Sequence, residues 1–377
     1  MKKRLASAAL CCVLPLTATA ESDITVGGAV RFQYSFEDYD EGNRQRVGDI
    51  DLDTVRINFD GSVDNILLSA ELRYYEYMEV VHHAWLGYQI NPEWQVQLGI
   101  TQLPFGNLPY NSHSFFFSSN YYLGLEDDYD FGIKFLYQGE HLESQIALFK
   151  NDEQGGIDGY VDNRSDRYSY DIVGSRQPGQ GIYDAPSASG ALAETNTLVW
   201  RVASDLLDQP NDSLQVGFSA LHGQLHDDQE TSAGDYSAFA LHMNGQFGAW
   251  NLQLSSGHYE YNPDDGSELM VVGAYSFFDT IAASADIHSA NIAYRFDAPV
   301  DGIDAITVYL DNSVVSGKSA DLDDTRMHVL GASVSKGSLF TYIDLIHGEN
   351  QPFIGSSMAA NAGNSNTRFN INVGFYF

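Results

Sequence analysis

The sequence predicts an all-β protein, a closed antiparallel transmembrane β-barrel with short periplasmic turns and long extracellular loops. Three observations predict it. The chain begins with an export signal, it has no helix-length apolar segment after that signal, and it repeats runs of about ten residues in which apolar and polar side chains alternate. Because alternate side chains of a strand point to opposite faces, each run offers one face to lipid and one to water.

Residues 1–20 have the order of a secretory signal: three basic residues, an apolar run and a small-residue end. We expect cleavage after Ala20, which leaves residues 21–377 as the mature barrel. The apolar run is too short to cross a bilayer as a helix, since a span needs about 20 apolar residues. Cys11 and Cys12 both lie inside the signal, so we expect neither a thiol nor a disulfide in the mature chain.

The mature chain is strongly acidic. Removal of the signal takes three of the 19 basic residues and leaves 16 against 51 acidic residues, a formal charge of −35. Nucleic acid is excluded as a partner class, because its phosphates require basic patches. Acidity of this kind serves solubility or, in a channel, selects cations through rings of Asp and Glu.

The number of strands follows from the alternating runs, of which about seventeen can be counted, whereas an antiparallel barrel with both ends in the periplasm needs an even number. We therefore predict 16 strands, with 18 as the alternative. The doubtful segments are residues 268–296, in which two candidate strands cannot both span, and residues 167–173, inside the longest loop. Either number leaves a lumen wide enough for water.

Aromatic residues distinguish this barrel from a soluble β-sandwich or β-helix, which would also show alternating strands. The chain has 21 Phe and 23 Tyr, and several of them end apolar runs, among them Phe36, Tyr74, Tyr88 and Tyr137. That placement is typical of the aromatic girdles at the two membrane interfaces of a barrel. A soluble fold would have to bury these rings instead.

Four stretches of the chain resemble the phosphate-selective porin family. Residues 52–61 and 84–106 are similar to its second, fourth and fifth strands, and Pro104-Phe105-Gly106 is the most specific part. Residues 306–312 and 340–348 are similar as well. The mature chain has four lysines, fewer than the pores of phosphate-binding members carry, so we take the resemblance as a guide to architecture and not to the solute.

The resemblance implies an outer-membrane porin that assembles as a homotrimer, in which each barrel has its own pore. It also implies that the terminal aromatic residue, Phe377, is an assembly signal read by the outer-membrane assembly machinery. The expected partners are outer-membrane lipid, lipopolysaccharide and small hydrophilic solutes, and the expected location is the bacterial outer membrane.

Basic side chains on the water side of the strands are the first candidates for function. Arginine there presents fixed donors to carboxylates, phosphates and sugar hydroxyls. Three successive strands could align their arginines as a ladder, or each arginine could pair with a lumen carboxylate such as Glu71 or Asp60 and hold the wall rigid. The alternation places on this side Arg31, Arg56, Arg73, which form the candidate ladder, and Lys134, Arg201 and Arg295.

Residues 107–130 follow the fifth strand, at the place where porin loops commonly fold inward and narrow the channel. We expect the acidic residues at the end of this segment to lie at the constriction, opposite the basic ladder, where they would set up a transverse field. The Phe residues at 115–117 would stack on sugars or, in the plainer interpretation, anchor the loop to the wall. The acidic residues are Glu126, Asp127, Asp128 and Asp130.

No motif in the chain predicts catalysis. The 11 histidines do not form a spacing with serine or with metal ligands beyond what chance gives, so we expect no enzyme, no cofactor and no metal site. Residues 152–163 are acidic and rich in glycine but lack the final Glu of a calcium loop. The sequence thus predicts a porin for passive diffusion of small hydrophilic solutes and ions, with either a mild preference for cations or a weak site for a polar solute. A substrate-specific anion channel of the phosphate type and an outer-membrane barrel enzyme are the alternatives.

Overall fold

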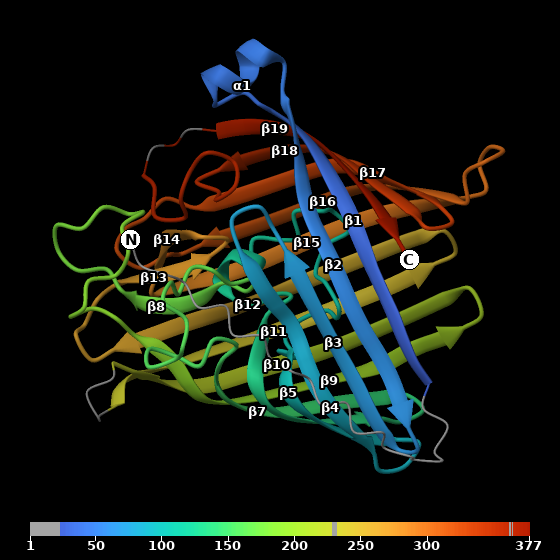
Figure 1. Ribbon diagram of the computed structural model, residues 1–377, viewed down its shortest axis with the longest axis horizontal. Helices are drawn as coiled ribbons and strands as arrows, with labels where there is room; N and C mark the ends of the chain where they lie inside the picture. The colour runs from blue at the N-terminus through green and yellow to red at the C-terminus, as the bar shows by residue number, and fades with distance from the viewer. Residues whose placement is uncertain (1–22, 228–231, 362, 364) are drawn as a thin grey trace, which may run out of the picture.

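Sixteen strands form a closed antiparallel barrel in the computed structural model (Figure 1). The structure describes residues 23–227, 232–361, 363 and 365–377, and the predicted signal peptide lies outside the described residues. The barrel strands are β1 (Asp23–Glu37), β2 (Asp49–Val63), β3 (Ile66–Tyr74), β4 (Glu79–Gln89), β5 (Trp94–Gln102), β6 (Tyr129–Gln138), β7 (Leu142–Asp152), β9 (Ala193–Gln209), β10 (Asp212–His226), β11 (Ser232–Phe247), β12 (Trp250–Pro263), β15 (Ser284–Asp297), β16 (Ala305–Ser316), β17 (Thr325–Lys336), β18 (Leu339–Glu349) and β19 (Ser365–Tyr376).

The ring closes between the first and last strands. β1 pairs with β2 on one side and with β19 on the other, and the seam sets Val30 opposite Phe375 and Tyr34 opposite Ile371. Because the number of antiparallel strands is even, the chain ends on the side of the barrel on which it began. The prediction of 16 strands rather than 18 is thus confirmed.

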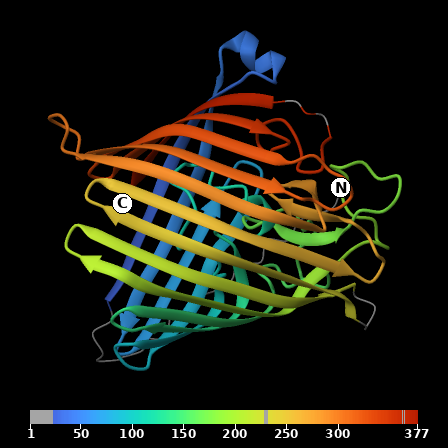
Figure 2. The ribbon, with the colours of Figure 1, turned by 180° about the vertical axis from the view of Figure 1, so that it is seen from behind.

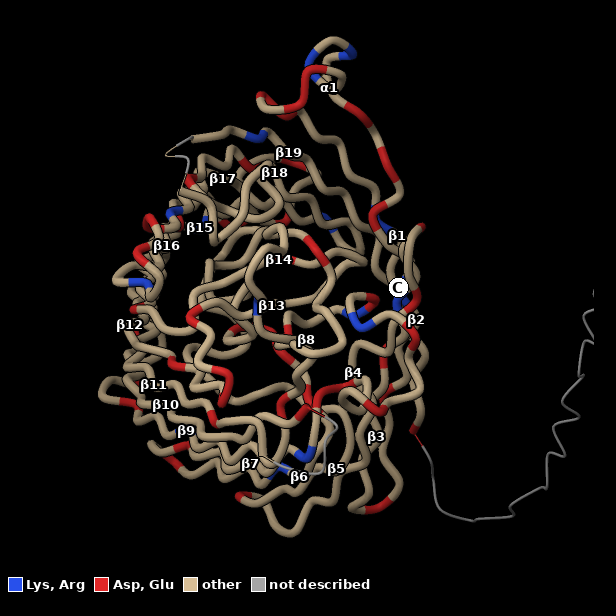
Figure 3. Tube along the Cα trace, turned by 90° about the vertical axis from the view of Figure 1, so that its left-hand side faces the viewer, with Lys and Arg blue, Asp and Glu red and all other residues tan. Residues whose placement is uncertain are grey.

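Three short strands form a separate inner sheet, in the order β14-β13-β8. They are β8 (Asp171–Ser175), β13 (Leu269–Ala274) and β14 (Phe277–Ala282). Figure 3 looks into the barrel from the side of the long loops and shows this sheet within the ring of barrel strands. Both segments that the strand count left in doubt therefore hold strands that do not span. Nearly all of their residues are buried, and an apolar run of this length does not reveal whether it faces lipid or the inside of a protein.

The outer face of the barrel is apolar, as the alternation predicts. Figure 2 shows β9 to β12, β15 and β16 side by side in the wall that carries much of this face. Large aliphatic side chains remain exposed on it, for example Leu241 at 63% and Leu330 at 61%. Such exposure would destabilise a protein in water and suits a protein surrounded by lipid.

Aromatic rings gather on the outer face near the short turns. Trp94 and Tyr137 lie with ring centroids 5.0 Å apart, and Trp250 and Tyr294 lie 4.7 Å apart. These pairs stand on neighbouring strands, since Trp94 is opposite Tyr137 and Trp250 is opposite Tyr294 in the ladder. They form one of the two girdles that the sequence predicts.

The connections at the two ends of the barrel differ. At the turn end they are tight, and Gly248 and Gly337 take φ values of 55° and 52° that favour glycine. The long connections lie at the other end, and the first of them contains α1 (Glu41–Arg46), which projects from the barrel (Figure 1). Asp40 caps α1 by accepting a hydrogen bond from the amide of Asn43 at 2.7 Å. In the part of the chain that the structure describes, no helix is long and apolar enough to cross a membrane.

Candidate functional site

The connection between β5 and β6, residues 103–128, crosses the lumen, and we call it the inner loop. The amides of His113 and Ser114 donate to Asp311 Oδ2 of β16 at 2.7 and 2.8 Å, and His113 Nδ1 lies 2.8 Å from Asp311 Oδ1. Burial opposes protonation of His113, but the hydrogen bond and charge of Asp311 outweigh it and raise the pKa of the imidazole. The inner loop is therefore fixed to the wall opposite the strands from which it departs.

Glu126 holds the inner loop together from within. Its carboxylate accepts hydrogen bonds from the amides of Asn111 and Ser118, at 2.8 and 3.1 Å, and from the Ser118 hydroxyl. The side chain is buried, and burial raises the pKa of Glu126 to about 7. The inner loop also contains a short 3-10 helix, η1 (Tyr121–Leu123), shortly before Glu126 in the chain.

A cavity of about 370 Å³ lies between the inner loop and the wall made by β19, β1, β2 and β3. The wall supplies charged side chains to it, and the inner loop supplies mainly aromatic ones. A volume of this size accommodates a small molecule rather than only a few waters. The cavity is therefore the candidate site through which a solute would pass or in which it would rest.

Four arginines from adjacent strands form what we call the arginine row. They line the cavity, and Arg56 of β2 stands directly opposite Arg73 of β3 in the ladder. Each guanidinium lies over an aromatic ring, with Cζ between 4.3 and 5.8 Å from the ring centroid, a cation–π geometry. The pairs are Arg368 of β19 over Phe116, Arg31 of β1 over Phe115, Arg56 over Tyr376 and Arg73 over Tyr168.

Carboxylates stand between the arginines of the row. Four positive charges face three negative ones, a local balance of +1. Of the four arginines, Arg73 also donates a hydrogen bond from Nε to Glu71. The ion pairs are Arg31 with Asp53 at 2.5 Å, Arg73 with Glu71 at 2.5 Å, Arg56 with Glu71 at 3.8 Å and Arg368 with Glu37 at 3.3 Å.

The side of the cavity opposite the row is aromatic. Phe115 and Phe116 of the inner loop meet edge to face with centroids 5.3 Å apart, and Phe117 stacks on Tyr121 at 4.4 Å. All four rings line the cavity, although Phe116 is only 7% exposed. The Phe residues thus both pack the inner loop and present ring surface to the cavity, so the two interpretations made from the sequence do not exclude each other.

The six basic residues that the sequence predicts for the pore lie at different places in the structure, and three of them line the cavity. Arg31, Arg56 and Arg73 line the cavity together. Lys134 donates to the carbonyl of Gln102, the last residue of β5, at 2.8 Å. Arg201 donates to the Gly106 carbonyl of the inner loop at 2.8 Å and pairs with Glu143. Arg295 lies exposed at the turn end, 2.7 Å from Asp297.

Arg368 is the member of the row that the sequence analysis did not single out. It belongs to the last strand, where Phe369, Ile371 and Val373 were recognised as the lipid-facing set. The same alternation places Arg368 on the water side with Asn370, so the signal was present in the sequence.

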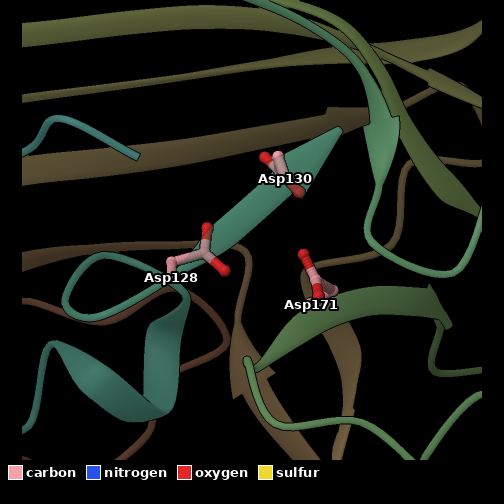
Figure 4. A group of neighbouring side chains, drawn as sticks. All are labelled: Asp128, Asp130 and Asp171. Carbon is pink, nitrogen blue, oxygen red and sulfur yellow. The ribbon is translucent and has the colours of Figure 1, made fainter. Parts of the chain in front are cut away.

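The four acidic residues expected at the constriction lie elsewhere in the described structure. All are 3% to 4% exposed, and none of them lines the cavity. Asp127 accepts hydrogen bonds from the hydroxyls of Tyr168 and Tyr129, at 2.6 and 3.0 Å. Asp128 and Asp130 turn toward Asp171 of β8 (Figure 4). Buried donors thus engage the oxygens of Glu126 and Asp127, although the charge of Arg73 still acts on Asp127.

One serine lies beside a histidine on the outer face, as a barrel hydrolase would require. Ser256 Oγ is 3.0 Å from His288 Nδ1. Within the described residues no carboxylate orients His288, because the adjacent Asp286 contacts His258 at 2.9 Å instead. The backbone around Ser256 also belongs to the regular β12–β15 ladder, so its amides are not turned toward a reacting oxyanion.

No family model matches the sequence, and no curated protein sequence matches it. Solved structures nevertheless share its fold. A trimer form of in-vitro folded OmpT, an outer-membrane protein of Vibrio cholerae, is similar with a TM-score of 0.56 at 13% identity, over 94% of this chain and 99% of that chain. An anion-selective porin from Comamonas acidovorans gives 0.56 at 12% identity over 95% and 100%, and the outer-membrane channel DcaP of Acinetobacter baumannii gives 0.57 at 10% over 94% and 97%.

These similarities establish the fold of the chain. The barrel is of the kind found in bacterial outer-membrane porins, and the exposed apolar face described above is the face that such a barrel turns to lipid. At identities of 10% to 13% they give no specific support to the phosphate-selective family and do not identify a solute.

Proposed function

We propose that this chain is an outer-membrane porin through which small hydrophilic solutes and ions diffuse passively. The observation that supports it is the inner loop, which narrows a 16-stranded lumen opposite the arginine row. A barrel of this size without such a loop would leave a wide aqueous opening, and the loop makes passage depend on the size and charge of the solute.

The direction of ion preference follows from two opposed charge distributions. The mature chain has a net charge of −35, and this excess of acidic residues raises the concentration of cations near the mouths of the channel. The arginine row, with a local balance of +1, favours anionic groups inside. We propose that cation preference prevails at low salt and weakens as salt screens the surface charges.

A substrate-specific anion channel is the second candidate, and the arginine row favours it. Its four guanidiniums converge on one cavity next to aromatic rings, an arrangement that could hold a carboxylate or phosphate on a ring-bearing solute. Carboxylates between the arginines favour the general porin instead, because they neutralise three of the four positive charges.

Reversal potentials across planar bilayers distinguish the two candidates. The purified mature protein would be measured in a salt gradient at low and at high ionic strength. A general porin gives a small cation preference that declines with salt, whereas an anion channel gives an anion preference that phosphate or a dicarboxylate blocks at low concentration. Absence of any channel activity from folded protein would contradict both.

The remaining partners belong to the same proposal. We infer a homotrimer, in line with the trimer form of OmpT, and chemical crosslinking in native membranes would test it.

Lipopolysaccharide is the proposed partner of the outer face near the long loops. There the outward positions carry polar side chains instead of aliphatic ones, namely His258 and Glu260 on β12 and Arg326 and His328 on β17. We further propose that the barrel is not an enzyme, so that a serine-hydrolase probe leaves Ser256 unmodified.

A further inference from the structure

Three aspartates from separate segments meet inside the barrel, next to the inner sheet (Figure 4). Asp128 ends the inner loop, Asp130 lies in β6, and Asp171 begins β8. One carboxylate oxygen from each lies within 4.8 Å of the others, and the three residues are only 3% to 4% exposed. Buried like charges at such distances repel one another unless something compensates them.

The basic residues nearby do not supply that compensation. Arg167 lies 2.6 Å from Asp171, but it also contacts Asp152 at 3.2 Å and Glu153 at 3.5 Å, so one guanidinium serves three carboxylates. In the described part of the chain, no basic side chain forms an ion pair with Asp128 or Asp130. When the three carboxylates are ionised, their negative charge is therefore not balanced by the described basic side chains, in a place from which water is largely excluded.

Two buried oxygens at this cluster also have no hydrogen-bond partner. They are Asp130 Oδ1 and Thr101 Oγ1, on residues that are 3% and 0% exposed. Thr101 of β5 stands directly opposite Asp130 in the ladder, so the two side chains leave the sheet side by side. A buried polar atom without a partner costs free energy, and here both atoms are oxygens, which are the ligands that hard cations bind.

We propose that Asp128, Asp130 and Asp171 bind a calcium ion. Ca²⁺ takes oxygen ligands at about 2.3 to 2.6 Å, so two of its ligands can stand up to about 5 Å apart, which the spacing of the three carboxylates satisfies. Mg²⁺ requires oxygen ligands at about 2.0 to 2.1 Å and gives up its water reluctantly, so we expect it to bind a buried cluster more weakly than Ca²⁺ does. Thr101, which stands opposite Asp130 in the ladder, would offer its hydroxyl as a further protein ligand.

The ion would join the barrel wall to the inner sheet. Asp130 belongs to the wall, Asp171 belongs to β8, and β8 is hydrogen bonded to β13. Calcium would thus fasten the inner sheet, whose neighbouring residues Tyr168 and Tyr275 line the cavity. This inference goes beyond the porin proposal, because the site would stabilise the barrel whether or not solutes pass through it.

Direct binding to the wild-type protein is the primary test. The mature chain is refolded in detergent without lipopolysaccharide, stripped with a chelator and titrated with Tb³⁺, whose luminescence Tyr129 can sensitise because it lies between Asp128 and Asp130 in the chain. We expect a saturable signal that Ca²⁺ displaces at lower concentration than Mg²⁺, and a higher unfolding temperature in Ca²⁺ than in chelator. A wild-type protein that shows neither effect would overturn the proposal and mean that the carboxylates share protons instead.

Variants locate the site. Asp130→Asn should weaken Ca²⁺ binding by about tenfold or more, the usual effect of altering a ligand or its support, and should remove most of the calcium-dependent rise in unfolding temperature. Asp162→Asn is the matched control, since Asp162 is an exposed carboxylate in the same connection as Asp171. Equal Ca²⁺ affinity in wild type and Asp130→Asn would refute the assignment. If Asp130→Asn does not fold, Thr101→Val should still lower the affinity, and an unchanged affinity in that variant would count against the site.

Discussion

At the scale of single residues, the balance of the arginine row decides the charge that a solute meets. Replacing both Arg56 and Arg73 by Ala changes the local balance from +1 to −1 and removes the two arginine partners of Glu71. We expect the reversal potential to shift toward cations while the barrel stays folded, because lumen positions tolerate substitution better than lipid-facing ones.

The matched control for this variant is Arg295→Ala, which removes a positive charge from the exposed turn end of β15. It should shift the reversal potential much less. If the double variant fails to fold, the arginine row is structural. If the double variant and Arg295→Ala shift the reversal potential equally, selectivity arises from diffuse surface charge.

Glu126 gives the inner loop a dependence on pH. Burial raises the pKa of Glu126 to about 7, above its value in the unfolded chain, so its contribution to stability is present at low pH and is lost as the pH rises through about 7. We expect the unfolding temperature of the wild type to fall between about pH 5 and about pH 8 and that of Glu126→Gln to fall less. Thermal unfolding followed by circular dichroism at the two pH values measures the difference, and parallel declines would contradict it.

The alternation of apolar and polar residues predicts well to which side of the barrel wall a side chain points. It does not predict which other segments cover that side chain. It places Arg31, Arg56 and Arg73 on the water side, and the structure brings them to one cavity. It also places Asp130 on the water side of β6, where the inner sheet then buries it against Asp171. A side chain that faces the lumen contacts either solvent or another segment of the chain. Which of the two it contacts depends on the long-range packing of the loops.

At the scale of elements, Asp311 is the anchor of the inner loop. It accepts hydrogen bonds from the amides of His113 and Ser114. Asp311→Ala should leave these buried donors unsatisfied, at a cost of about 1 to 3 kcal/mol for each, and loosen the loop. We expect a larger and noisier single-channel conductance than in the wild type.

Asp297→Ala serves as the control for the anchor, because Asp297 lies exposed at the turn end of β15 and its carboxylate pairs with the solvent-exposed Arg295. Its conductance should match that of the wild type. A wild-type conductance in Asp311→Ala would show that the remaining contacts of the loop suffice to hold it.

The inner sheet shows why the count of strands was ambiguous. β13 and β14 are six residues each and rich in apolar side chains, and β8 is five residues long. Spanning strands of the same barrel run from 9 to 17 residues. Length, rather than hydrophobicity, separates the two kinds, and strand boundaries are the feature that alternation defines least.

At the scale of the whole molecule, the last residue completes the hydrogen-bond ladder. The Phe377 amide donates to the Gly28 carbonyl at 3.0 Å, and the Phe377 carbonyl accepts from the Gly28 amide at 2.9 Å. The ring is 64% exposed on the outside. We predict that deletion of Phe377 lowers the amount of folded barrel in the outer membrane, as measured by heat-modifiable migration of membrane fractions.

Phe377→Tyr retains an aromatic ring and the backbone contacts, so it should restore most of the folded protein. Normal levels of the deletion variant would argue against Phe377 as an assembly signal.

The seam between β1 and β19 also sets the order in which the molecule can form. It joins the first strand to the last, with Phe36 opposite Phe369. Until β19 pairs with it, β1 has an unpaired edge that could join another copy. The ring can therefore shut only once β19 is in place, and a chain without β19 would leave β1 and β18 each with an open edge.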